Sequence, residues 1–416
     1  VPQGFEKHYR NDAVLLLLKT IYGLVQSAYA WWRIVLTAFK SMGYERSKVD
    51  PCLFYKWTKK HGLQVWMTWI DDCFSCGTNE AVKEAKEQLH DYFKGECDDG
   101  GELQEYVGCK IEYNREERWI RLTQPVLVQS FKDEYDLPDA ETPITPAIPG
   151  KILMESETIL SKAKHTYFRS GIGKLLHLMK WSRPEIMNAV RDLTRFATKV
   201  GEPHIKAMHR VMKYCVDTPK RGLLLKPDAK WNGDPAFEFT IGGRADSDFS
   251  KDPSTRSVTG YNAFLNGASF SRKSHLQTTT TLSVTEAETV AAVECVQDML
   301  FGMHLLESMG LKVKKPMVLE VDNKGAKDLA HNWSIGGRTR HIATKINFLR
   351  ELKEQGLLIV RWIPTTANTS DLFTKNLNGP DFEWQTAYYV GVDEYMKTKE
   401  HKKHKVAQGE NAGNCD

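Results

Sequence analysis

From residue 236 to 378 the sequence alternates short apolar runs with amphipathic stretches in an order that few folds accommodate. Three strand-like runs come first, "FEFTIGGRADS", "SVTGYNAFLNG" and "ASFSRKS", and a long helical pattern over 284–309 follows them. A further strand, "PMVLEVD", then two helices, the strand "LLIVRWIP" and a helix start complete the order. The changes between period 2 and period 3.6 predict a mixed α/β domain of about 140 residues.

Four acidic residues lie where such a fold would gather them. Asp246 and Asp322 end predicted strands, and Glu288 and Asp371 open predicted helices. Carboxylates this close repel one another unless cations are bound between them. Mg²⁺ prefers hard oxygen ligands, and two cations about 4 Å apart can activate a water and stabilise the leaving oxygen of a phosphodiester. The pattern therefore indicates a two-metal site that cuts phosphodiester bonds.

Simpler interpretations exist for each of these acidic residues. Asp248 is a rival of Asp246, because it lies two residues on and on the same strand face. Glu288 could be a solvated helix residue, while Glu286 could be the capping-box partner of Ser283. Asp322 and Asp371 could each cap the helix that follows. The order of strand Asp, helix Glu, strand Asp and helix Asp within one domain favours the metal site.

Helices and hairpins alternate in the first 137 residues, which is typical of an α+β domain. The runs "CLFYKW" and "LQVWMTW" predict a hairpin across "TKKHG", and "YVGCKIEYN" and "WIRLTQ" predict another across "REER". Asp71 and Asp72 follow the second of these runs. An adjacent acidic pair after an apolar strand can ligate metal, although a polar turn is the commoner explanation.

The Pro-rich stretch "LPDAETPITPAIPGK" predicts an extended linker after the first domain. Residues 163–216 are strongly helical in pattern. We therefore expect four segments: 1–137 with an α+β pattern, 138–235 with the linker and helices, 236–378 with the α/β pattern, and a polar tail over 379–416. The composition of the tail favours disorder.

The formal net charge is only +4, which permits nucleic-acid binding without requiring it. No run of eighteen apolar residues indicates a membrane span. The first residues, "VPQGFEKHYRND", do not resemble a signal peptide, and no initiating Met is present. We therefore expect an intracellular protein without a membrane partner, and a processed or truncated piece of a longer one.

Residues 240–378 resemble the ribonuclease H domain of copia-type LTR retrotransposon polyproteins. The stretches that carry the resemblance are "ADSDFSKDPSTRSVTGYNAFLNGASFS", "LSVTEAETVAA", "VDNKGAKDLA", "RTRHIATKINFLRE" and "SDLFTK". The resemblance implies a ribonuclease H-like mixed five-stranded sheet with flanking helices, and cleavage of the RNA strand of an RNA–DNA hybrid. It also implies two Mg²⁺ ions, or Mn²⁺ in their place, held by the catalytic residues Asp246, Glu288, Asp322 and Asp371.

Preference for RNA would require contacts to 2′-hydroxyls along the shallow minor groove of the hybrid. The resemblance places the helix around His341 near the substrate. The candidate contacts are polar or basic residues near the expected site: Arg256, Ser257, Arg338, Arg340, His341 and Lys345. Solvated surface charge explains any one of them at least as well.

The first half resembles the palm of copia-type reverse transcriptases through "LKTIYGLVQSAYAWW", "DPCLFYKW", "WIDD" and "YVGCKIEYNREERWIRLTQ". Residues 163–225 resemble the helical thumb or connection that follows the palm. The usual Tyr-Val-Asp-Asp is replaced here by the run from Trp69 to Asp72. Val25 and Tyr29 stand where Lys and Arg are usual in the family's "YGLKQAPRAW", which weakens basic contacts to the template.

The family's polymerase needs a third metal-binding Asp on a strand upstream of Val1, so we expect this chain alone not to polymerise DNA. The first hypothesis is therefore a reverse transcriptase/ribonuclease H fragment in which only the ribonuclease H site is complete. One alternative is an inactive retroelement relic that at most binds nucleic acid. Another is a part of a longer, active RNA-directed DNA polymerase.

The expected partners are an RNA–DNA hybrid, an RNA template, DNA, and other parts of the parent polyprotein. If the chain is expressed, its expected location is a cytoplasmic virus-like particle or the nucleus.

Overall fold

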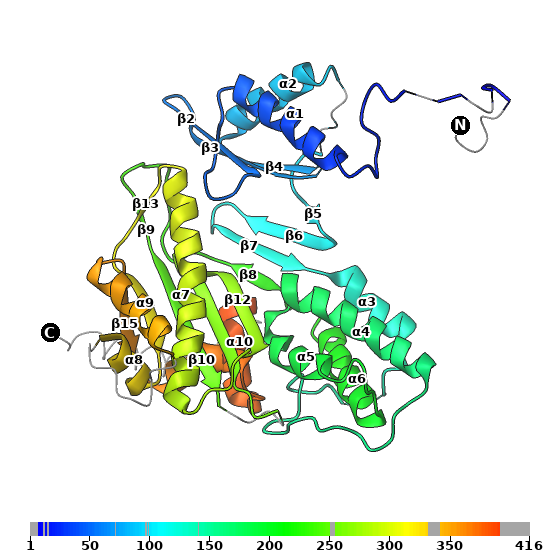
Figure 1. Ribbon diagram of the computed structural model, residues 1–416, viewed down its shortest axis with the longest axis vertical. Coiled ribbons are helices and arrows are strands. Elements are labelled where there is room, and N and C mark those ends of the chain that lie inside the picture. The colour runs from blue at the N-terminus through cyan, green and yellow to red at the C-terminus, as the bar shows by residue number, and fades with distance from the viewer. Residues whose placement is uncertain are drawn as a thin grey trace. The chain divides into compact units, whose positions relative to one another are not determined.

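The computed structural model describes residues 7–391, apart from 11, 12, 15, 71, 96, 97, 99, 140, 250–253 and 332–341. The chain divides into two compact units, Val1–Gly101 and Glu102–Asp416, whose elements are labelled in Figure 1. Residues 102–137, expected in the first domain, lie instead in the second unit. We therefore describe the two units separately.

The first unit is a four-stranded antiparallel sheet with two helices. In sheet order its strands are β1 (Glu45–Arg46), β2 (Leu53–Thr58), β3 (Gly62–Trp69) and β4 (Asp72–Cys76). The helices are α1 (Ser27–Ser41) and α2 (Asn79–Tyr92). The ring of Phe39 in α1 stacks on that of Phe54, with 4.5 Å between ring centroids, and Trp66 completes this aromatic core. The predicted hairpin across "TKKHG" is confirmed as β2 and β3.

The second unit begins with a second antiparallel sheet. Its strands are β5 (Glu105–Tyr106), β6 (Cys109–Asn114), β7 (Trp119–Thr123) and β8 (Leu223–Leu225). The hairpin predicted across "REER" is confirmed as β6 and β7. Since β7 also pairs with β8, a strand about a hundred residues later, this hairpin belongs to the second unit rather than to the first.

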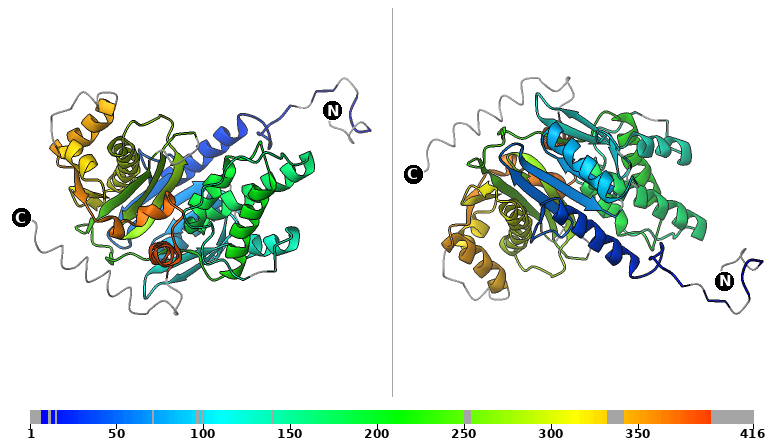
Figure 2. Two further views of the ribbon diagram at one scale, coloured as in Figure 1. Left: turned by 90° about the horizontal axis from the view of Figure 1, so that it is seen from below. Right: turned by 90° about the horizontal axis from the view of Figure 1, so that it is seen from above.

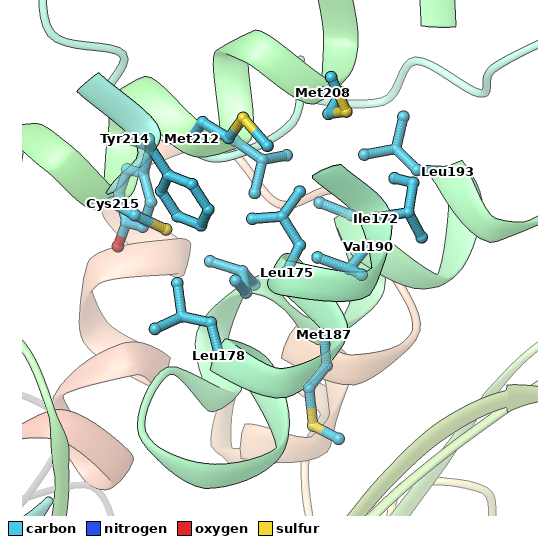
Figure 3. Packing of buried hydrophobic residues seen from close by; sticks show 14 of the residues in the cluster. Ile172, Leu175, Leu178, Met187, Val190, Leu193, Met208, Met212, Tyr214 and Cys215 are labelled. Carbon is cyan, nitrogen blue, oxygen red and sulfur yellow. The ribbon is translucent and has the colours of Figure 1, made fainter. Parts of the chain in front are cut away.

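A helical layer lies between β7 and β8 in the sequence. It consists of α3 (Pro125–Glu134), α4 (Lys162–Trp181), the 3₁₀ turn η1 (Pro184–Ile186), α5 (Met187–Thr194) and α6 (Glu202–Asp217). Figure 3 shows the apolar side chains of α4, α5 and α6 packed against one another. Leu175 and Met212 are fully buried there. A side chain at Gly171 would meet the Met208 sulfur at 2.4 Å, so glycine permits the close approach of α4 and α6.

The chain then forms the mixed five-stranded sheet that was predicted. Its sheet order is β12 (Ala268–Leu276), β11 (Val258–Leu265), β10 (Ile241–Asp248), β14 (Met317–Val321) and β15 (Leu358–Trp362). The pairs β10–β11 and β11–β12 are antiparallel, while β14 runs parallel to both β10 and β15. The strands β9 (Glu238–Phe239) and β13 (Lys312–Val313) form a separate parallel pair.

Helix α7 (Val284–Ser308) covers one face of this sheet, and Figure 2 shows it end-on beside the strands. A Cβ at Gly243 of β10 would lie 2.5 Å from the Cys295 sulfur of α7, so the two elements touch directly. Helices α8 (Lys324–His331) and α9 (Ala343–Glu354) pack beside α7. The 3₁₀ turns η3 (Thr365–Ala367) and η4 (Thr369–Phe373) follow β15, and η4 lies against β10 and β11.

One described helix, α7, is long and apolar enough to cross a membrane by length and composition alone. Many of its apolar residues are buried, including Val290, Ala291, Cys295, Val296, Met299 and Met303. They cover the sheet, as the residues of a core helix do. The expected absence of a membrane partner stays a prediction.

The expected polar tail from residue 379 needs correction in its first part. Residues 379–390 form a helix, α10 (Gly379–Val390). Tyr389 is fully buried, and its hydroxyl donates to the Thr369 carbonyl at 3.1 Å. Phe382 is also buried, so apolar residues at helical spacing order this stretch against the domain. The tail beyond 391 lies outside the described residues.

His275 of β12 and Glu294 of α7 predict a pH-dependent contribution to stability. Their Nε2 and Oε2 atoms are 2.5 Å apart, and this hydrogen bond raises the pKa of His275 above 6.5, although burial and Lys273 oppose the rise. The contribution is complete below the unfolded pKa of about 6.5 and is lost as pH rises through the higher folded pKa.

Because both side chains are partly exposed, we expect a loss of at most about 1 kcal/mol. Urea unfolding at about pH 6 and about pH 9 measures it. Glu294→Gln should reduce the pH-dependent difference by the contribution of this pair, whereas an unchanged difference in that variant would assign it to other groups.

Candidate metal centre

Three carboxylates converge at one end of the five-stranded sheet. Asp246 lies near the end of β10, Asp322 directly follows β14, and Glu288 lies on the first turns of α7. Because β10 and β14 are adjacent parallel strands, their carboxyl ends meet at the same edge. One oxygen from each carboxylate lies within 4.8 Å of one from both others. Asp246 and Glu288 are only 1% and 3% exposed, so water screens their charges poorly.

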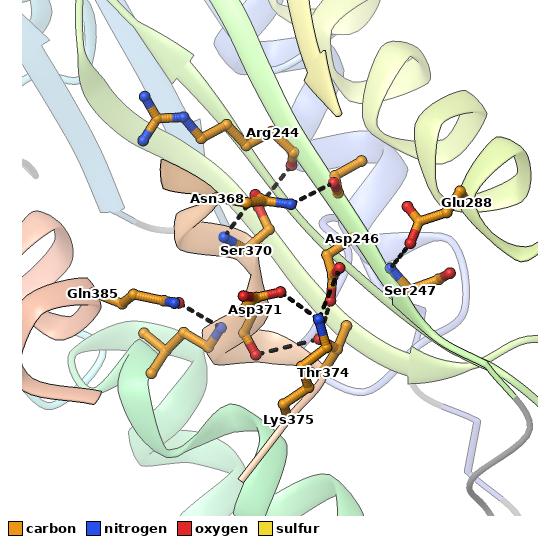
Figure 4. Close-up of polar contacts among 12 residues, drawn as sticks. Arg244, Asp246, Ser247, Glu288, Asn368, Ser370, Asp371, Thr374, Lys375 and Gln385 are labelled. Atoms are coloured by element: carbon orange, nitrogen blue, oxygen red, sulfur yellow. Dashed lines mark hydrogen bonds and ion pairs between the residues drawn. The ribbon is translucent and has the colours of Figure 1, made fainter. Parts of the chain in front are cut away.

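Asp371 joins this group through Lys375. The ammonium of Lys375 is 2.5 Å from Asp371 Oδ1 and 3.2 Å from Asp246 Oδ1. Figure 4 draws both contacts as dashed lines. The Thr374 hydroxyl donates to the second oxygen of Asp246. The structure therefore brings all four predicted carboxylates into one neighbourhood, three in direct proximity and the fourth across a shared ammonium.

Hydrogen bonds to the backbone of β10 hold η4 in place. Asn368 Nδ2 donates to the Ala245 carbonyl at 3.0 Å, and the Ser370 hydroxyl donates to the Arg244 carbonyl at 2.9 Å. From α10, the side chain of Gln385 accepts the N–H of Leu372 at 2.8 Å. These contacts fix the segment that carries Asp371 independently of any charge in the centre.

The crowded carboxylates disfavour their own ionisation. Burial, followed by the charge of Asp371, raises the pKa of Asp246 well above its usual value, although Lys375 opposes the rise. Burial and the charge of Asp322 raise the pKa of Glu288 to about 8. Burial opposes the charge of Lys375, but Asp246 and Asp371 outweigh it and raise the pKa of the ammonium. One lysine thus faces four carboxylates, and the centre favours additional positive charge.

Glu288 provides a direct test of whether a cation would fit. Its Oε1 accepts the backbone N–H of Ser247 at 3.1 Å. Its Oε2 is buried and has no hydrogen-bond partner in the described part of the chain. A buried oxygen in this state is costly, and a divalent cation with oxygen ligands would satisfy it. The donor set consists only of carboxylates, which suits Mg²⁺ or Mn²⁺.

Of the simpler interpretations of the acidic residues, the structure supports the one for Glu286 and not the one for Glu288. Glu286 does form the capping box: Leu282 N–H donates to its Oε2 at 2.6 Å, and its own N–H donates to the Ser283 hydroxyl at 3.2 Å. Glu288 is buried rather than solvated. Asp248, the rival of Asp246, is not part of the carboxylate group found among the described residues.

The other predicted site residues are only partly accounted for. Asp71, Arg338, Arg340 and His341 lie outside the described residues. Asp72 is exposed at the start of β4, and Arg256 is exposed before β11. Lys345 is partly exposed on α9. Ser257 is fully buried, with its hydroxyl 2.8 Å from that of Thr281, so its side chain faces the interior and not the solvent.

Two residues of the centre, Thr374 and Lys375, were not predicted. Lys375 follows Asp371 by four residues in "SDLFTK". That spacing could have indicated an ion pair on one helical turn. It could not have indicated that the same ammonium reaches Asp246, because that residue lies 129 positions away.

Gly260 of β11, which pairs with Asp246, controls how closely η4 approaches the sheet. A Cβ here would lie 2.5 Å from Thr374 Cγ2 and 2.9 Å from Phe373 Cβ. Gly260→Ala should therefore displace η4 and lower the free energy of unfolding by about 1–3 kcal/mol, measured in urea.

Gly173→Ala in α4 is the control for this change. No heavy atom lies within 4 Å of a Cβ built there, so alanine should be neutral or should stabilise by up to about 1 kcal/mol. Equal stability of the Gly260 variant and the wild type would contradict the close packing of η4.

Comparison with known proteins places these features in a family context. Residues 1–149 match the family described as "Reverse transcriptase (RNA-dependent DNA polymerase)". The chain is 29% identical over 391 residues to the retrovirus-related Pol polyprotein from transposon TNT 1-94 of Nicotiana tabacum, covering 92% of this chain and 28% of that protein. It is 28% identical over 394 residues to the corresponding polyprotein from transposon RE1 of Arabidopsis thaliana, covering 94% and 26%. The chain thus spans roughly a quarter of the length of these relatives.

Among solved structures, LC11-RNase H1 in complex with an RNA/DNA hybrid is similar to part of the chain. The match has 15% sequence identity and a TM-score of 0.26, and it covers 32% of this chain and 94% of that structure.

Proposed function

We infer, from the premise that this chain belongs to the copia-type retrotransposon Pol polyproteins, that it hydrolyses the RNA strand of RNA–DNA hybrids. The observation that carries this proposal is the convergence of Asp246, Glu288 and Asp322, in which one buried oxygen of Glu288 lacks a partner among the described residues. Such a centre suits cation-assisted hydrolysis of a phosphodiester. The activity proposed is that of a ribonuclease H.

Asp246, Glu288, Asp322 and Asp371 would hold the divalent cations, which we propose to be two Mg²⁺ ions with Mn²⁺ as a substitute. When bound, such ions supply an activated water and stabilise the developing charge on the leaving oxygen. The Ser247 N–H orients Glu288 by hydrogen bonding to Oε1.

Thr374 and Lys375 keep Asp246 and Asp371 oriented toward each other. Since these contacts are made by the chain's own side chains, the chain itself pre-organises the carboxylates, which reduces the reorganisation that the reaction requires.

Contacts to the hybrid are proposed for the basic residues around the centre. Arg256 is exposed and Lys345 partly exposed, so both side chains are accessible to a ligand. Arg338, Arg340 and His341 remain proposed contacts on the basis of the family resemblance. The hybrid would be recognised by its backbone and 2′-hydroxyls and not by its sequence.

We also propose that Asp71 and Asp72 belong to a reverse transcriptase palm, because residues 1–149 match that family. Polymerisation by the two-cation route needs carboxylates from more than one strand. Asp71 lies outside the described residues. We propose that this chain alone does not extend a primer, and primer extension on an RNA template tests that point.

Hydrolysis of an RNA–DNA hybrid labelled in its RNA strand tests the main proposal. We expect cleavage by the wild-type chain with Mg²⁺ or Mn²⁺, and none by the double variant Asp246→Asn/Asp322→Asn. A DNA duplex of the same sequence should stay intact. Failure of folded wild-type protein to cleave under either metal would refute the proposal and favour an inactive, nucleic-acid-binding relic.

A further inference from the structure

Trp362, the last residue of β15, presents a large aromatic surface beside the metal centre. Its side chain is 42% exposed, although the ring is fixed in place. The indole Nε1–H donates to the backbone carbonyl of Asp322 at 3.0 Å. The next N–H, that of Ile363, donates to the Val321 carbonyl at 2.9 Å and extends the β14–β15 pairing to this point. The exposed ring is therefore anchored to the residue that carries one of the three converging carboxylates.

Lys324 adds a cation to the same surface. It is exposed at the start of α8, two residues after Asp322, and its ammonium lies 4.9 Å from the centre of the Trp362 ring. No carboxylate partner of this ammonium is found among the described residues. A cation over an exposed ring is worth only about 0.5–1 kcal/mol, so a phosphate could readily attract the ammonium away from the indole.

Single exposed apolar residues are common and need no explanation by themselves. Trp362 differs in two respects, because its ring is held by a hydrogen bond and because a cation and a proposed catalytic carboxylate adjoin it. The buried carboxylates repel the phosphates of any approaching strand. A cation at the edge of the centre therefore favours the approach of a phosphodiester.

We propose that Trp362 and Lys324 bind the sugar–phosphate backbone of the strand whose phosphate lies at the carboxylates. The indole packs against a sugar, and the Lys324 ammonium pairs with a neighbouring phosphate. This inference rests on the proposed ribonuclease function and adds to it a substrate-contact surface made of these two side chains.

Equilibrium binding of a fluorescent RNA–DNA hybrid, with Ca²⁺ replacing Mg²⁺ and with intact RNA verified, tests the inference. Trp362→Ala should weaken binding about tenfold at constant salt, within the range for the loss of an aromatic contact to nucleic acid. For Trp362→Ala, the slope of log K for binding against log salt concentration should equal that of the wild type, because no phosphate contact is lost. Trp362→Phe should retain most of the affinity, because an aromatic surface remains.

Lys324→Gln should reduce the slope of log K against log salt by about 1, as expected for one lost phosphate contact. The controls are Phe301→Ala, an aromatic residue 49% exposed further along α7, and Lys312→Gln, an exposed lysine on β13. Neither control should change affinity or slope.

Unchanged affinity in Trp362→Ala together with an unchanged slope in Lys324→Gln would overturn the inference, while cleavage by the wild type would leave the proposed function standing. If circular dichroism shows that Trp362→Ala is unfolded, the slope of Lys324→Gln decides the matter. Wild-type protein that neither binds nor cleaves the hybrid would overturn the function and this inference together.

Discussion

Replacing Glu288 with Gln is expected to slow hydrolysis of an RNA–DNA hybrid by about 10²–10³-fold, the scale on which loss of one group that stabilises transition-state charge is felt. Gln keeps the volume of the side chain and can still accept the Ser247 N–H, which lies 3.1 Å from Glu288 Oε1. It lacks the negative charge that a hard divalent cation requires. Single-turnover rates with protein in excess over hybrid measure the change without interference from product release.

Glu286→Gln is the matched control for this change. Glu286 lies two residues earlier in the same helix and is 2% exposed, against 3% for Glu288. Its Oε2 accepts the Leu282 N–H at 2.6 Å, and Gln fills the same role in a capping box. The Glu286 variant should therefore cleave at close to the wild-type rate. An equal loss in both variants would point to damage at the start of α7 and would contradict a metal-binding role for Glu288.

The order of helices and strands could be predicted where the signal is local. The two early hairpins show apolar runs separated by polar turns, and the long helix α7 has a sustained apolar composition, so the sequence within each element suffices. The partner of the β6–β7 hairpin could not be predicted this way. This hairpin pairs with β8, a strand about a hundred residues away. Residues 102–137 therefore belong to the second unit and not to the first.

The sequence predicted the carboxylates of the centre but not the residues that contact them. Asp246 lies near the end of a strand and Asp322 directly follows one, and the strand-like runs "FEFTIGGRADS" and "PMVLEVD" indicate both positions. Lys375 reaches Asp246 only because η4 folds back on β10, through contacts such as that of Asn368 with Ala245. The burial of Ser257 could not be predicted either. Ser257 precedes a strand, and nothing in the local sequence indicates that its hydroxyl is covered by Thr281.

The charge imbalance of the centre predicts that Asp246→Asn stabilises the metal-free protein. Asp246 is 1% exposed, and Lys375 is the one cation found beside it and Asp371 in the described structure. Asn has nearly the same volume and can still accept the hydrogen bond from Thr374. Neutralising one of several crowded, buried carboxylates removes part of the repulsion among them, so the melting temperature in EDTA should be at or above that of the wild type.

Addition of Mg²⁺ should reverse this order. A cation that binds only the folded wild type stabilises it by about 2.7 kcal/mol at a concentration of 100 Kd, and the Asn variant should lose most of that gain. Asp298→Asn is the control, because Asp298 accepts the Tyr261 hydroxyl at 2.7 Å and lies near Lys273, so its charge is compensated. That variant should melt below the wild type in EDTA and keep the full response to Mg²⁺. If Asp246→Asn instead melts below the wild type in EDTA and gains as much from Mg²⁺, the four carboxylates do not form a cation site. Since these measurements need no substrate, they separate metal binding by the centre from the identity of the nucleic acid that it cuts.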